Sequence, residues 1–121
     1  LTEPETESLL EVDGLASGEL ESVMLWTIWR DDGSGGGVAG DNIQNGTEPT
    51  LYSGNPADMT LPVYDSTTVG GPLLAGFTGY IGVSWSLPSA SGNETQTDSL
   101  VGDISFSAIQ SRNNLAYTCV P

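Results

Sequence analysis

The sequence predicts an all-β fold, either an antiparallel jelly roll or a β-sandwich. Three features favour this class: segments rich in β-branched and aromatic residues, repeated turn signals between them, and no long stretch with the period of a helix. The chain has 121 residues, a length that suits one domain. We therefore expect a single β-sandwich domain over residues 1–121, with a linker or edge segment at 1–21 and the core at 22–121.

The first expected strand covers residues 22–29, Ser-Val-Met-Leu-Trp-Thr-Ile-Trp, and is apolar enough to be covered on both faces. Residues 30–42 follow as a glycine-rich loop that can form neither helix nor strand. A short strand is expected at 49–53. The irregular region 54–76, interrupted by prolines, would contain one helical turn near 57–61.

The clearest strand pattern is the period-two alternation of apolar and polar residues over 77–87. Its apolar face would carry Phe77, Gly79, Ile81, Val83, Trp85 and Leu87. Pro88 ends this strand because proline cannot donate to the hydrogen-bond ladder. A second alternating strand is expected at 100–108, and a final strand-like segment at 115–120.

The charge balance is strongly acidic and excludes several partners. Sixteen acidic residues face two arginines, without lysine or histidine, so the formal net charge is -14. Such a surface argues against binding to nucleic acid or to an anionic membrane. A lysine-free acidic surface is typical of extreme halophiles, in which salt screens the self-repulsion. The alternative is an acidic surface protein from a low-salt host. No apolar run is long enough to span a bilayer.

The residue types present argue against an enzyme. Without histidine or lysine, only carboxylate-based schemes remain, and a glycosidase would need two positioned carboxylates. The candidates fall mostly in loops or on polar faces, where solvation is expected: Glu11, Glu21, Asp65, Glu94 and Asp103. Zinc is also disfavoured, because the chain has one cysteine and no histidine. As the single cysteine, Cys119 either pairs with another chain or with a missing piece, or is a buried apolar residue of a last strand.

Calcium is the metal that the sequence allows. Hard oxygen ligands gather around the glycine-rich loop: Asp31, Asp32, Asp41 and Asn42, with Asn45 and Glu48 nearby. The spacing matches no EF-hand, because residues 33–39 carry no carboxylate. The alternative is an acidic, solvated hairpin loop.

Two other kinds of surface site are suggested. The sequons Asn45-Gly46-Thr47 and Asn93-Glu94-Thr95 both fall in expected loops, so we expect a glycan on Asn45 or Asn93. Five aromatic residues could form a sugar-binding platform or belong to the core: Trp26, Trp29, Tyr80, Trp85 and Tyr117. Tyr80 is the best candidate for exposure, because it points away from the apolar face of its strand.

Several motifs resemble the C-terminal half of the TasA/camelysin-like family, whose members carry SipW-dependent signal peptides and are numerous in haloarchaea. The strongest are YIGVSWSLP at 80–88, GNETQTDS at 92–99 and DISFSAIQSRN at 103–113. Weaker similarity is found upstream at 1–5, 22–32, 40–42 and 48–54, so the resemblance covers most of residues 1–114. One departure is Asn113, where the family usually has histidine.

The resemblance implies a secreted jelly-roll subunit that polymerises head to tail with identical subunits outside the cell or on its surface. Such subunits build extracellular or biofilm-matrix fibres by donor-strand complementation, in which another chain's strand completes an incomplete sheet. The family's first strands and usual donor segment are not recognisable here. The donated segment would be 115–120, with Leu115, Tyr117 and Cys119 as assembly residues, or the acidic stretch 7–13. The alternative function is a secreted carbohydrate- or calcium-binding module.

Overall fold

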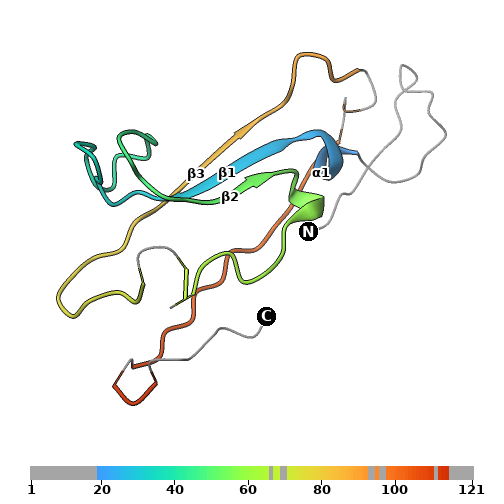
Figure 1. Cartoon of the computed structure of the whole chain (residues 1–121). Coiled ribbons are helices and arrows are strands. Elements are labelled where there is room, and N and C mark those ends of the chain that lie inside the picture. The colour runs from blue at the N-terminus through green and yellow to red at the C-terminus, as the bar shows by residue number, and fades with distance from the viewer. Residues whose placement is uncertain are drawn as a thin grey trace.

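The computed structural model describes residues 19–65, 67–68, 71–92, 95, 98–110 and 112–114. Its regular elements, in chain order, are the short helix α1 (Leu20–Val23), strands β1 (Leu25–Arg30) and β2 (Thr50–Gly54), the 3-10 helix η1 (Pro56–Asp58) and strand β3 (Ile81–Ser86) (Figure 1). Regular structure is thus mostly strand with little helix, which agrees with the predicted all-β class. A jelly roll is not formed by these described elements.

The three strands make one antiparallel sheet in the order β2-β1-β3. In an antiparallel pair, side chains of opposed residues project from the same face. Trp26 lies opposite Trp85, and Ile28 lies opposite both Val83 and Tyr52. The register therefore gives an aromatic face, made of Trp26, Ile28, Arg30, Tyr52, Ile81, Val83 and Trp85. The other face, called here the serine face, carries Leu25, Thr27, Trp29, Ser53, Gly82, Ser84 and Ser86.

The described part of the chain has a small apolar core. Its buried hydrophobic residues are Leu20, Ile28 and Trp29, and the Trp29 side chain is only 2% exposed. Trp29 lies directly opposite Gly82, and a Cβ atom added to Gly82 would collide with the indole ring. Glycine at position 82 therefore provides the space in which Trp29 is buried on the serine face.

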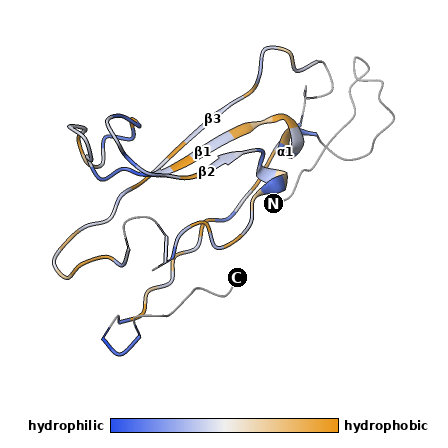
Figure 2. Cartoon of the chain, in the orientation of Figure 1, coloured by the Kyte–Doolittle hydropathy of each residue, from blue (hydrophilic) through white to orange (hydrophobic). Residues whose placement is uncertain are grey.

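Most large apolar residues lie outside this core. Figure 2 shows hydrophobic residues on the strands and, at intervals, along the extended segments that leave the sheet. Trp85 on the aromatic face is 66% exposed, and Phe106 on the segment 98–110 is 83% exposed. The aromatic face is therefore covered only in part, since Ile28 on it is buried and Trp85 is not. Apolar exposure of this extent is costly in water.

The first strand prediction is correct from residue 25 and wrong before it. Ser22 and Val23 belong to α1, in which the backbone N–H of Met24 donates to the carbonyl of Leu20 at 2.9 Å. The Ser22 hydroxyl also donates to the Glu19 carbonyl at 2.8 Å. Such local bonds let serine favour a turn over an extended strand.

The middle of the chain follows the prediction closely. The strand expected at 49–53 is β2, shifted by one residue, and the helical turn expected near 57–61 is the 3-10 helix η1 at Pro56–Asp58. The glycine-rich loop is confirmed as a loop, since no helix or strand lies between β1 and β2.

The two alternating segments differ from the prediction. The strand expected at 77–87 is shortened to β3, and its supposedly buried face is exposed at Phe77, Trp85 and Leu87. The prediction of a strand at 100–108 is wrong, because these residues form no strand apart from an isolated bridge at Val101. Alternation marks a segment suited to pairing, but a strand also requires a neighbour to pair with.

Some predictions fall on residues outside the described ranges. They concern residues 1–18, the sequon residue Asn93, and the segment 115–120 with Leu115, Tyr117 and Cys119. The division into a linker at 1–21 and a core at 22–121 also stays a prediction.

Candidate functional site

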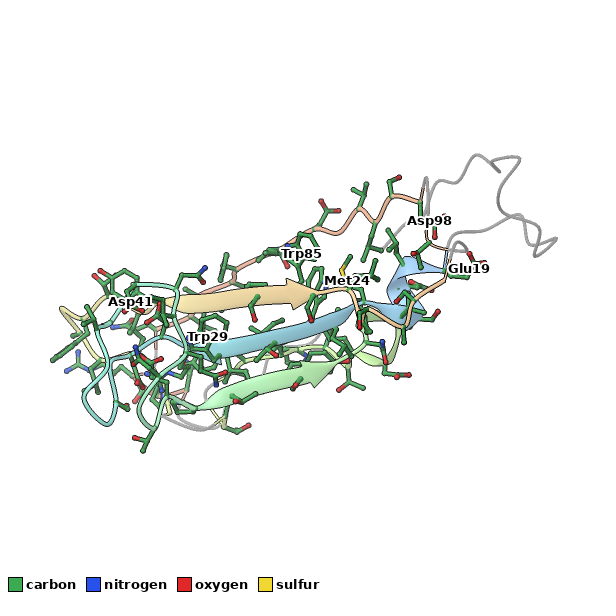
Figure 3. The ribbon with its side chains drawn as sticks, turned by 90° about the horizontal axis from the view of Figure 1, so that it is seen from above. Glu19, Met24, Trp29, Asp41, Trp85 and Asp98 are labelled. Atoms are coloured by element: carbon green, nitrogen blue, oxygen red, sulfur yellow. The ribbon has the colours of Figure 1, made fainter. Side chains whose placement is uncertain are left out.

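Two regions at opposite ends of the sheet contain buried carboxylate groups (Figure 3). The first is the acidic loop between β1 and β2, residues 31–49. Asp31 is 2% exposed, and its Oδ1 and Oδ2 atoms accept hydrogen bonds from the backbone N–H groups of Gly40 at 2.9 Å and Asn42 at 2.6 Å. Charge-assisted bonds of this kind stabilise a buried carboxylate.

Glu48 has the same role in the second half of the loop. It is 6% exposed, and its two carboxylate oxygens accept the backbone N–H groups of Gly33 at 2.9 Å and Asn45 at 3.1 Å. A Cβ atom at Gly37 would strike the Asn45 side chain and approach Glu48 closely. The loop is therefore glycine-rich where backbone must approach a side chain closely, and two carboxylates hold it together.

The predicted calcium ligands each accept hydrogen bonds from different donors of the chain. Asp32 Oδ1 accepts the Ser34 N–H at 3.0 Å and the Ser34 hydroxyl, and this side-chain hydrogen bond lowers the pKa of the Asp32 carboxyl. Asp41 Oδ1 accepts the Ile43 N–H at 2.9 Å. Asn42 Oδ1 accepts the Val83 N–H of β3 at 3.1 Å. Within the described ranges, no three His, Cys, Asp or Glu side chains form a group that could hold a metal ion, and calcium stays a prediction.

The described sequon lies in a tight turn of the same loop. The Glu48 N–H donates to the Asn45 carbonyl at 3.2 Å, and the Thr47 N–H donates to the Ser34 carbonyl at 2.9 Å. Asn45 is half-buried, and its Oδ1 is buried near Gly37. A glycan on Asn45 stays a prediction.

The second region is a pocket at the α1 end of the sheet. A cavity of about 340 Å³ is lined by Leu20, Met24, Trp26, Trp85, Asp98, Ser99 and Leu100. We call it the tryptophan pocket. Two of its walls are the opposed side chains Trp26 and Trp85 of the aromatic face. The Trp26 indole N–H donates to the Met24 sulfur at 2.8 Å, which fixes this ring at the cavity wall.

Asp98 supplies a carboxylate to this mostly apolar pocket. Its Oδ2 accepts the backbone N–H of Glu19 at 2.8 Å. Its Oδ1 is buried and accepts no hydrogen bond from the described part of the chain. A buried carboxylate oxygen without a donor is unfavourable, because desolvation is not compensated. The pocket thus combines mostly apolar walls with two polar residues, Asp98 and Ser99, which is a composition also found in binding sites.

The five aromatic candidates do not form one platform. Trp29 is buried on the serine face, whereas Trp26 and Trp85 lie together on the aromatic face. Tyr80 is 45% exposed and its ring lies against Gly40 of the acidic loop, so the prediction that it is the most exposed of these residues is wrong: Trp85 is 66% exposed. The pairing of Trp26 with Trp85 was not predicted, since it depends on the register between strands that are far apart in the sequence.

The chain has no match among known proteins: no family model, no curated protein and no solved structure matches it. The TasA/camelysin-like resemblance therefore stays a prediction, and function must be argued from the residues themselves. In the described ranges, no helix is long and apolar enough to cross a membrane.

Proposed function

We propose that this chain is a structural subunit of an extracellular or cell-surface filament, assembled from identical subunits by donor-strand complementation. The observation that carries the proposal is the incompletely covered aromatic face of a three-stranded sheet, on which Ile28 is buried but Trp85 is 66% exposed. Such a face needs a covering layer, and a neighbouring subunit can provide it.

The backbone of the sheet supports the same proposal. Both β2 and β3 are edge strands in the described sheet, and an edge strand offers unpaired N–H and C=O groups to another chain. Strand addition uses these groups for affinity and side-chain pockets for specificity. Because donor and acceptor surfaces differ, contacts of this kind are head to tail and continue into an open filament when the rotation between subunits does not close a ring.

The extended segment 98–110 offers a second argument. It has the alternation of a strand, yet Ile104 is 71% exposed and Phe106 is 83% exposed. Residues of this type gain free energy when a partner covers them. The acidic, lysine-free composition fits assembly in concentrated salt, which screens repulsion between subunits.

Electron microscopy of negatively stained material at molar salt concentration tests the proposal. The intact chain is compared with variants that lack residues 1–18 or 115–121, and with Cys119→Ser to separate disulfide-linked from strand-linked assembly. Regular fibres that are lost with one terminal segment support strand donation and identify the donor. An intact chain that stays monomeric at all accessible concentrations would contradict it.

A secreted carbohydrate-binding module is the second candidate, because Trp26 and Trp85 form an apolar wall beside the Asp98 carboxylate. Aromatic rings and a few polar groups are typical of ligand pockets. This function requires a monomer whose tryptophan fluorescence changes when oligosaccharides are added. Binding of a glycan by a non-assembling chain would favour it over the filament.

A further inference from the structure

The tryptophan pocket has the chemistry of a cation-binding site. Two indole rings, of Trp26 and Trp85, line it, and the face of an indole attracts a cation. Asp98 adds a carboxylate whose Oδ1 is buried without a hydrogen-bond donor from the described residues. Figure 3 shows Glu19 near Asp98, although Glu19 does not line the pocket. A planar guanidinium group satisfies both features, because it stacks on aromatic rings and donates to carboxylates.

Only two side chains in the whole sequence can supply a guanidinium group, and there is no lysine. Arg30 is engaged within its own subunit: its guanidinium carbon lies 5.7 Å from the centroid of the Tyr64 ring, and its Nε lies 4.0 Å from Asp32 Oδ2. Arg112 is exposed and forms no ion pair with a carboxylate of the described ranges.

The backbone around Arg112 forms a turn that presents this side chain to solvent. The Asn114 side-chain amide donates to the carbonyl groups of Gln110 at 3.0 Å and Arg112 at 3.3 Å. Asn113 adopts a left-handed conformation, with φ of 66°, which asparagine tolerates better than most residues. The turn therefore holds a lone cationic group at the surface of a very acidic molecule.

Arg112 and the pocket of the same subunit are far apart along an extended path. The segment 98–110 starts beside α1 and runs away from it, and residues 112–114, red in Figure 1, lie beyond its far end. The guanidinium group that reaches the pocket must therefore come from another copy. A contact between two different surfaces of identical copies is head to tail, and it builds an open filament unless the rotation between copies closes into a ring.

We infer that Arg112 of one subunit inserts into the tryptophan pocket of the next, between Trp26 and Trp85 and against Asp98. This inference rests on the proposed filament and names one of its contacts. The site is incomplete in a single chain, because the neighbouring copy contributes the cation. At molar salt the screening length is about 3 Å, so a direct contact persists while longer-range attraction is lost.

The critical concentration for assembly of the full chain, measured by sedimentation at molar salt, tests the inference. Arg112→Gln and Asp98→Asn are each expected to raise it about tenfold, as for the loss of one charge-assisted contact. The double variant should have the same critical concentration as either single variant, because both substitutions remove the same contact. Arg112→Lys keeps the charge but loses the planar guanidinium group, so its critical concentration should lie between those of the wild type and Arg112→Gln. Asp58→Asn, an equal charge change at an exposed position outside both the pocket and the segment 98–110, is the matched control.

Charge reversal provides a test that a loss of folding cannot imitate. Asp98→Arg alone and Arg112→Asp alone should each fail to assemble, because both partners in the contact then have the same charge. A mixture of the two variants should form fibres, since each pocket now meets an opposite charge on the other variant. Rescue in the mixture supports the contact between copies.

The outcomes separate the inference from the filament proposal. If wild-type fibres form and Arg112→Gln assembles like the wild type, the inference is wrong and the filament proposal stands. If Arg112→Gln assembles poorly while Asp98→Asn does not, Arg112 binds elsewhere and the inference is again wrong. If the wild-type chain forms no assemblies, both are wrong.

Discussion

The two ends of the sheet differ in how many hydrogen bonds their carboxylates accept from the chain. At the acidic-loop end, Asp31 and Glu48 each accept two backbone N–H groups of their own loop. At the pocket end, Asp98 accepts one backbone N–H, and its other oxygen is buried without a donor from the described residues. The first end satisfies both buried carboxylates within one chain, although Trp29 Nε1 and Asn45 Oδ1 there are buried without a partner among the described residues. The second end leaves a carboxylate oxygen without a donor in the described part of the chain, next to exposed apolar side chains.

The tryptophans divide in the same way. Trp29 is buried next to the acidic loop, over Gly82, while Trp85 at the pocket end is 66% exposed. Residue type is therefore no guide to role in this molecule, because tryptophan and aspartate stabilise the fold at one end of the sheet and are exposed or only partly hydrogen-bonded at the other. Substitutions at each end test this difference.

The largest difference is expected between the two tryptophans. Trp29→Ala should lower the free energy of unfolding by about 4 kcal/mol, because it leaves a cavity in a small core. Trp85→Ala should lower it by less than about 1 kcal/mol, since most of this side chain is in water. Urea unfolding at fixed salt, followed by circular dichroism, measures both. Equal losses would show that Trp85 is part of the core of the single chain.

The carboxylates should differ by somewhat less. Asp31→Ala is expected to cost about 3 kcal/mol, because it leaves the N–H groups of Gly40 and Asn42 without an acceptor. Asp98→Asn should change the stability of the monomer by less than about 1 kcal/mol, because the amide oxygen can still accept the Glu19 N–H. The same urea experiment applies, below the concentration at which the chain assembles. A large loss for Asp98→Asn would mean that this carboxylate has an internal partner.

A substitution of Gly82 tests how tightly Trp29 is packed at the acidic-loop end of the sheet. Gly82→Ala should cost about 2 kcal/mol, because the added methyl group collides with the Trp29 ring and forces it to move. Gly79→Ala is the matched control, since its Cβ would meet only Leu73 at 3.4 Å, an ordinary contact. Thermal unfolding of the two variants compares them. If they melt alike, Trp29 is not packed against Gly82.

The smallest effect is expected for Ser34→Ala in the acidic loop. The Ser34 hydroxyl holds the pKa of the Asp32 carboxyl below its ordinary value in the folded chain. A lowered folded pKa stabilises the fold above the unfolded pKa, and this contribution is lost as the pH falls through the folded pKa. Removing the hydroxyl should raise the Asp32 pKa and reduce stability near neutral pH by less than about 1 kcal/mol. An NMR titration of the carboxyl carbon checks the direction, and an unchanged pKa would contradict it.

Sequence patterns predicted the strands better than the contacts between them. The β-branched and aromatic residues of β1 and the alternation in β3 are local signals: β3 lies inside its predicted range, and β1 runs one residue past the end of its own. The segment 100–108 has the same alternation but forms no strand, because pairing depends on a neighbour that its own residues do not specify.

The sites were harder to predict than the strands. Asp31 was predicted as a possible calcium ligand from its oxygen atoms, but these atoms accept the N–H groups of a loop whose glycines allow close approach. The signal was present in the glycines around it, which indicate backbone donors near side chains. The tryptophan pocket had no local signal, because it combines residues of α1, β1, β3 and the segment after residue 98.

The unequal burial of Trp29 and Trp85 also gives the molecule two optical reporters. The emission of Trp29, shielded from water, reports whether the sheet is folded. The emission of Trp85, open to solvent, is accessible to a soluble quencher such as iodide and changes when its environment becomes apolar. In a Trp26→Phe variant, which removes the third indole, fluorescence quenching can therefore follow folding and surface coverage separately.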